Sequence, residues 1–158
     1  EHTSINPNSS PHVGRIRNAL IGDSIVRINK FFGFKPEVHY YVNDVSKQIA
    51  ILVLANAEKS SFSEMLKKYS ETAQKVEADK ELEKKVFTLL YKFEHKDKET
   101  TKKFKAIVST CVKGQAKILS KLGIEYDYFD YESKYVRNSE NILNLCIIKF
   151  CIYKNLTL

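Results

Sequence analysis

The first third of the chain passes from a polar loop into an apolar pattern of helical period and then into a short β-rich run. Over residues 13–32 the apolar positions share one broad face, made by Ile21, Ile25, Ile28 and Phe32 with Ile16 and Leu20 beside it. So wide an apolar face predicts a helix that is buried in the protein. Gly33 follows directly and is the expected C-cap, because only glycine adopts a left-handed conformation at little cost.

The following segment indicates a strand and then a second helix. Residues 37–42, after Pro36, are rich in aromatic and β-branched side chains, which favour a strand. Asn43-Asp44 is then expected to cap a helix over about residues 44–57. With a short strand at the start of residues 1–12, the order predicts an α/β unit whose parallel strands are joined by a right-handed crossover.

The middle of the chain is helical throughout. Ser61 and Glu64 have the spacing of a capping box, and three successive runs of apolar residues at helical spacing follow, the last of them closed by Gly123. Residues 124–130 alternate between apolar and polar and predict a strand, whereas the tail from Ser139 fits neither period. We therefore divide the chain into residues 1–57, a helical insertion at 58–123, and a return strand with an atypical tail at 124–158.

Composition limits the classes of protein that the chain can represent. It has 158 residues, 43% hydrophobic and 28% charged, which suits one domain or part of a larger one. The net charge of +7 is equally compatible with a nucleic-acid partner and with a solvated basic surface. Cys111, Cys146 and Cys151 form no CxxC pair, so we expect no structural metal site, free thiols and a cytoplasmic location. No apolar stretch is long enough to cross a membrane.

The candidate chemistry lies at residues 11–15, where the loop enters the first predicted helix. A glycine at this position lets a ligand approach the backbone, and the free N–H groups of a helix start attract phosphate. His12 can donate a hydrogen bond to a phosphate oxygen, and Arg15 can stabilise negative charge in a transition state. The glycine-rich patterns of dinucleotide-binding and P-loop proteins are absent from the sequence.

Several motifs in order resemble the active-site region of arginyl-tRNA synthetases of the archaeal or eukaryotic type, over roughly residues 1–137. His12-Val13-Gly14 is similar to the start of the His-x-Gly-His signature of class I synthetases. The remaining motifs are Glu1-His2-Thr3-Ser4 with Asn6-Pro7, Arg17-Asn18-Ala19, Ile21-Gly22-Asp23, Tyr41-Val42-Asn43-Asp44 with Gln48, Gly123-Ile124-Glu125-Tyr126-Asp127 and Tyr131-Glu132-Ser133.

This resemblance implies a fold and a reaction. The fold would be α/β, the first half of a class I synthetase Rossmann-like nucleotide-binding domain with a helical insertion. The reaction would join arginine to its tRNA through arginyl-adenylate, with ATP as a substrate that carries Mg²⁺. The implied roles are arginine binding by Glu1, Ser4 and Asn6, ATP binding by His12, Gly14 and Asn18, and catalysis by His12 and Arg15, with no metal held by the protein.

Departures from the family pattern keep two other functions open. Arg15 stands in place of the second signature histidine, Ser46 stands in place of an expected glycine, and the lysine-rich loop that clamps ATP is absent from the sequence. Arg15, Ser46 and the atypical tail favour a non-catalytic paralogue that binds ATP, arginine or tRNA, and the missing loop implies that this chain alone is an incomplete enzyme. The third reading is a basic RNA-binding helical module for which residues 1–56 are the scaffold.

Overall fold

The computed structural model describes residues 1–6, 8 and 10–136, which form three strands and six helices. In chain order these are β1 (Thr3–Ser4), α1 (Val13–Phe31), β2 (His39–Val42), α2 (Lys47–Leu54), α3 (Phe62–Ala78), α4 (Lys80–Glu94), α5 (Lys98–Ser120), β3 (Tyr128–Tyr131) and α6 (Glu132–Val136). The tail from Ser139, with Cys146 and Cys151, lies outside the described residues.

The three strands form one parallel sheet in the order β1-β2-β3, which confirms the predicted α/β unit. Thr3 pairs with Tyr40, and Tyr40 pairs in turn with Phe129. β3 begins later than the alternation at 124–130 suggested. The backbone N–H groups of Asp127 and Tyr128 both donate to the carbonyl of Val38, so ladder pairing starts only where His39 meets Tyr128.

The four helices α2 to α5 hold most of the buried core. α2 packs against α3, α4 and α5, and five consecutive residues of α2, from Ile49 to Val53, are buried. The capping box of Ser61 and Glu64 is present at the start of α3, as predicted. Gly123 has φ +74° just beyond α5, which confirms its role in ending that helix.

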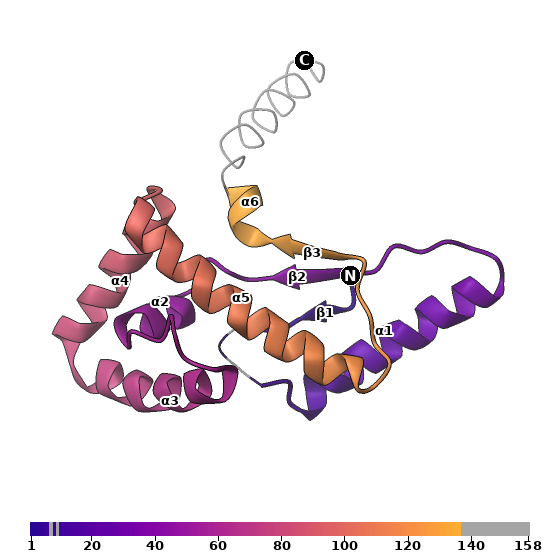
Figure 1. Ribbon diagram of the computed structural model, residues 1–158, viewed down its shortest axis with the longest axis horizontal. Coiled ribbons are helices and arrows are strands. Elements are labelled where there is room, and N and C mark those ends of the chain that lie inside the picture. Colours follow the sequence, from indigo (N-terminus) through magenta and orange to yellow (C-terminus); the bar gives the residue numbers. More distant parts are fainter. Residues whose placement is uncertain (7, 9, 137–158) are drawn as a thin grey trace, which may run out of the picture.

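Two predictions for the first half are wrong. α1 has the predicted extent, but its apolar face is not buried, since Ile21, Ile25 and Ile28 are 54–56% exposed and Ala19 alone is buried. Figure 1 shows the reason: α1 extends from one end of the molecule, whereas α2, α3 and α4 gather at the other end. The helical period predicted the face correctly, and no described element covers it.

The second error concerns the cap of α2. Ser46, not Asn43-Asp44, is the N-cap, and its hydroxyl accepts from the backbone N–H of Ile49. Asp44 instead receives two hydrogen bonds from Ser133, which follows β3. The carboxylate therefore joins the ends of two neighbouring strands, and serine at position 46 has a structural explanation.

Candidate functional site

β1 leads through a short loop into α1, and this strand-to-helix corner carries the predicted phosphate-binding residues. His12 is the N-cap of α1 with an extended backbone (φ −94°, ψ 168°), and its side chain makes no capping hydrogen bond. The side chain of His12 lies close to the backbone of Gly14, because a Cβ at Gly14 would stand 3.4 Å from His12 Cε1. His12, Val13 and Gly14 are all exposed, so the start of α1 is open to a ligand.

A cleft of about 400 Å³ lies beside this corner, between β1 and α1. Four of the predicted site residues line it: Glu1, Ser4, Arg15 and Asn18. The structure thus brings residues predicted for arginine together with residues predicted for ATP and catalysis. His12, Gly14 and Asn6 are not among the residues that line the cleft.

Arg15 fixes the geometry of one wall of the cleft. Its Nη1 atom donates to the backbone carbonyl of Ser4, 2.5 Å away. This bond links the last residue of β1 to the first turn of α1 and holds a guanidinium at the carboxyl end of the strand. A cation placed there suits an anionic group in the cleft.

Sequence reasoning missed His2 and gave no role to Gly22, although both form the cleft. A Cβ on Gly22 would lie 2.1 Å from His2 Cβ, so only glycine allows the strand and the helix to approach so closely. His2 Nδ1 lies 2.8 Å from Thr3 Oγ1, and burial lowers the pKa of the His2 imidazole. The sequence signal that could have pointed to them is that both residues lie within motifs of the resemblance.

A buried hydrogen-bond chain connects the loop after β1 to α5. Tyr40 donates through its hydroxyl to Gln115 Oε1 over 2.6 Å, and Gln115 Nε2 donates to the backbone carbonyl of Asn6 over 2.9 Å. Tyr40 and Gln115 are 1% and 0% exposed. Because a polar group in such surroundings is costly to leave unpaired, α5 holds the backbone at Asn6 in place.

The described residues offer neither a metal cage nor a reactive thiol. Within residues 1–136, excepting 7 and 9, no group of three or more His, Cys, Asp or Glu side chains could hold a metal ion. Cys111 is free and buried, and burial raises the pKa of its thiol to about 12. None of the helices in this same part of the chain is long and apolar enough to span a membrane.

Comparisons with known proteins agree with the resemblance noted in the sequence. Residues 1–146 match the family model described as tRNA synthetases class I (R), catalytic domain. The chain is 39% identical to the arginine–tRNA ligase of Methanocaldococcus jannaschii and to that of Archaeoglobus fulgidus, each match covering 87% of this chain and 26% of the relative. It is 40% identical to that of Methanoregula boonei, over 89% of this chain and 26% of the relative. The chain therefore spans about a quarter of the length of these curated relatives.

Proposed function

Since the chain belongs to the family of class I tRNA synthetase catalytic domains of the arginine type, we propose that it supplies the arginine- and ATP-binding part of an arginine–tRNA ligase. Its three parallel strands would form the first half of a Rossmann-like domain. The divisions near residues 57 and 123, with 58–123 as an insertion, stay a prediction. The observation that carries the proposal is the cleft in which Glu1, Ser4, Arg15 and Asn18 meet beside the start of α1.

The proposed reaction has two steps. A carboxylate oxygen of arginine attacks the α-phosphorus of ATP, which forms arginyl-adenylate and releases pyrophosphate. A hydroxyl of the terminal ribose of tRNA then attacks the arginyl carbonyl, and AMP leaves. Neither step needs a covalent bond to the protein, so the protein contributes alignment and stabilisation of charge. We place this reaction in the cytoplasm.

Arginine would lie in the cleft with its guanidinium toward Glu1. A carboxylate can accept two parallel N–H···O bonds from a guanidinium, which gives both affinity and orientation. Ser4 lines the same cleft. Asn6 lies in the loop that follows β1, where Gln115 bonds its backbone carbonyl, and it would bind arginine from that loop. The substrate carboxylate would then lie toward Arg15.

ATP would approach the exposed start of α1. His12 and the free N–H groups of the first helical turn would bind its phosphates, Gly14 would let the nucleotide come close, and Asn18 would contact it from one turn further along. Arg15 would stabilise the charge that develops at the α-phosphate. The described residues form no metal cage, so Mg²⁺ would arrive bound to the ATP phosphates, and we derive no step through a metal held by the protein.

Arginine titration of the ¹⁵N-labelled chain in the presence of MgATP tests the amino-acid half of the proposal. Arginine should shift the amide signals of Ser4, Arg15 and Gly22, whereas citrulline, which has the same shape without the charge, should not. Glu1→Gln should weaken arginine binding by roughly tenfold. Glu37→Gln removes an exposed carboxylate outside the cleft and serves as the matched control. Equal shifts with citrulline would contradict the proposal.

A second candidate, a paralogue that binds ligands without forming adenylate, is favoured by one contact. Arg15, in place of a histidine, already donates to the carbonyl of Ser4 and would have to leave that bond or share it to contact phosphate. Arginine-dependent exchange of pyrophosphate into ATP separates the two functions. Exchange by the chain that is lost in His12→Ala and retained in His95→Ala supports the ligase. Binding of arginine without exchange, combined with exchange in Arg15→His, supports the paralogue.

A further inference from the structure

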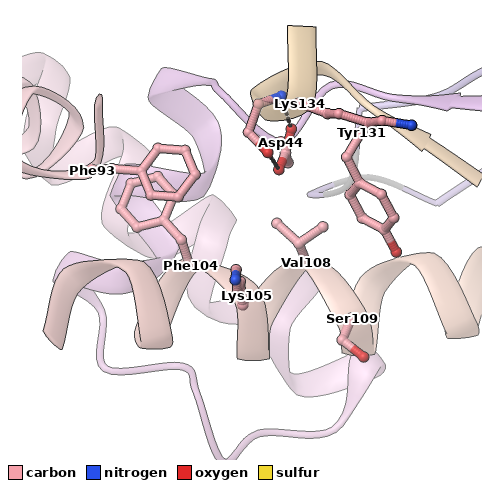
Figure 2. A pocket seen from close by; sticks show the side chains of 9 residues that line it. Asp44, Phe93, Phe104, Lys105, Val108, Ser109, Tyr131 and Lys134 are labelled. Carbon is pink, nitrogen blue, oxygen red and sulfur yellow. Dashed lines mark hydrogen bonds between the residues drawn. The ribbon is translucent and has the colours of Figure 1, made fainter. Parts of the chain in front are cut away.

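A second cavity, larger than the cleft, lies at the carboxyl ends of β2 and β3 and shares no lining residue with it. Its volume is about 530 Å³, within the range of sites for small molecules. Figure 2 shows the space between α5 below it and the turns that follow β2 and β3 above it. It is lined by Asp44, Phe93, Phe104, Lys105, Val108, Ser109, Tyr131, Ser133 and Lys134.

Two opposite walls of the cavity are aromatic. Phe93 and Phe104 are stacked with their ring centroids 4.2 Å apart and an interplanar angle of 7°. Figure 2 places this pair on one side of the space and the ring of Tyr131 on the other, with Val108 on the floor between them. These groups bound a slot in which Tyr131, 36% exposed, offers the open ring face, because Phe93, Phe104 and Val108 are at most 5% exposed.

The charged groups that line the cavity are two lysines and one carboxylate. Asp44 Oδ1 accepts from the backbone N–H of Ser133 over 2.8 Å, and Asp44 Oδ2 accepts from its hydroxyl over 2.6 Å. Both carboxylate oxygens are thus already bonded within the protein. Lys105 and Lys134 are exposed at the rim, and neither forms a salt bridge with a carboxylate of the described residues.

We propose that this cavity binds a nucleotide, with its base stacked on Tyr131 and its phosphate at Lys105 and Ser109. The base supplies the planar ring, and the phosphate supplies the charge that the rim lysines complement. A free nucleotide and an unpaired residue of an RNA strand carry this same chemistry. The inference goes beyond the arginine- and ATP-binding cleft because it concerns a different cavity.

The probe is adenosine monophosphate, titrated into the chain with ¹³C-labelled valine methyl groups and ¹⁵N-labelled amides. It should shift the methyl signals of Val108 and the amide signal of Ser109. Adenosine and ribose 5-phosphate should each bind roughly tenfold more weakly, because each lacks one half of the recognised chemistry. A single-stranded tetra-adenylate that binds more tightly than the monophosphate at the same residues identifies RNA as the source, and equal or weaker binding identifies a free nucleotide.

Variants separate this site from the cleft. Lys105→Glu should weaken binding at Val108 by roughly tenfold, and Lys113→Glu, which changes an exposed lysine of the same helix outside the cavity, should not. Ser109→Tyr fills the slot and should abolish the shifts while the remaining amide spectrum stays unchanged. His12→Ala, which alters the other corner, should leave them intact. Shifts confined to Ser4 and Asn18 and lost in His12→Ala, or equal effects of the two lysine variants, would overturn the inference.

Discussion

α1 and α5 are both long helices with an apolar face, yet they differ in what covers that face. Eight residues of α5 are buried, and the helix packs against α2, α3 and α4. In α1 only Ala19 is buried, although the helix carries isoleucines on a continuous face. α1 contacts the β1 segment where Gly22 approaches His2 closely. Nearer the end of the helix, Arg27 donates a hydrogen bond to the backbone carbonyl of Gly123.

The difference teaches that an apolar face becomes part of a core only where another element meets it. Burial of apolar surface stabilises by about 25 cal/mol per Å², so α5 contributes much more of this term than α1 does. The proposed cleft lies on the lightly held helix, and the second cavity lies on the firmly held one. Substitutions in the two helices, and one ion pair at the sheet for comparison, test this contrast.

The largest expected effect comes from truncating a phenylalanine in each helix. Phe104→Ala should lower the free energy of unfolding by about 3–5 kcal/mol, because it leaves a void and removes the partner of Phe93. Phe31→Ala, at a position that is 86% exposed in α1, should cost less than about 0.5 kcal/mol. Urea unfolding followed by circular dichroism measures both values. Similar losses in the two variants would mean that the face of α1 is packed after all.

The next effect concerns the bond chain from α5 to the loop after β1. Gln115→Leu should cost about 1–3 kcal/mol, because it leaves the buried hydroxyl of Tyr40 without its acceptor. Adding Tyr40→Phe should recover part of the loss. Gln74→Leu, on an exposed face of α3, is the control and should have almost no effect in the same unfolding assay. An unchanged amide signal of Asn6 in Gln115→Leu would contradict the inference that Gln115 holds the loop after β1 in place.

A smaller effect is expected where α1 meets β1. Gly22→Ala gains helix propensity but forces His2 outward, and the net loss should be about 1 kcal/mol. Hydrogen exchange of the Thr3 amide reports whether β1 has separated from the helix, and arginine shifts in the cleft should disappear. In Gly14→Ala the new Cβ stands 3.4 Å from the nearest atom of His12, so the Thr3 amide should keep its protection.

The smallest effect should come from a half-buried ion pair at the sheet. His39 Nδ1 lies 2.5 Å from Asp130 Oδ2, and this hydrogen bond raises the pKa of His39 and lowers that of Asp130. The histidine contribution is fully present below its ordinary pKa of 6.5 and is lost as the pH rises through the raised value. The aspartate contribution is present above its ordinary pKa of 3.8 and is lost as the pH falls through the lowered value.

The pair should therefore stabilise most between about pH 4 and pH 6.5. The difference in urea midpoint between the parent chain and His39→Gln should be larger at pH 5.5 than at pH 8.5. Asp130→Asn should remove the same pH dependence. A difference that grows toward pH 8.5 would contradict the assignment.

Local signals predicted the elements well, and contacts between distant residues explain most of the errors. The capping box at Ser61 and the helix end at Gly123 depend on neighbours in sequence, and both are confirmed. The cap of α2 was misassigned because Asp44 is bonded to Ser133, 89 positions away. Four of the predicted site residues line one cleft, but the need for glycine at position 22 follows only from knowing that His2 lies against it.

The sequence by itself determined the family, the order of the elements as far as β3 and the parallel α/β unit, since motifs, helical period and caps act over short stretches of chain. Only the tertiary structure decided which apolar faces are covered, which side chains meet in the cleft, and where the aromatic walls of the second cavity come together. The physical reason is that burial and close approach depend on surfaces that distant segments bring to one another. The spacing of apolar residues along the chain shows which face of a helix or strand is apolar, but it does not show which other element packs against that face.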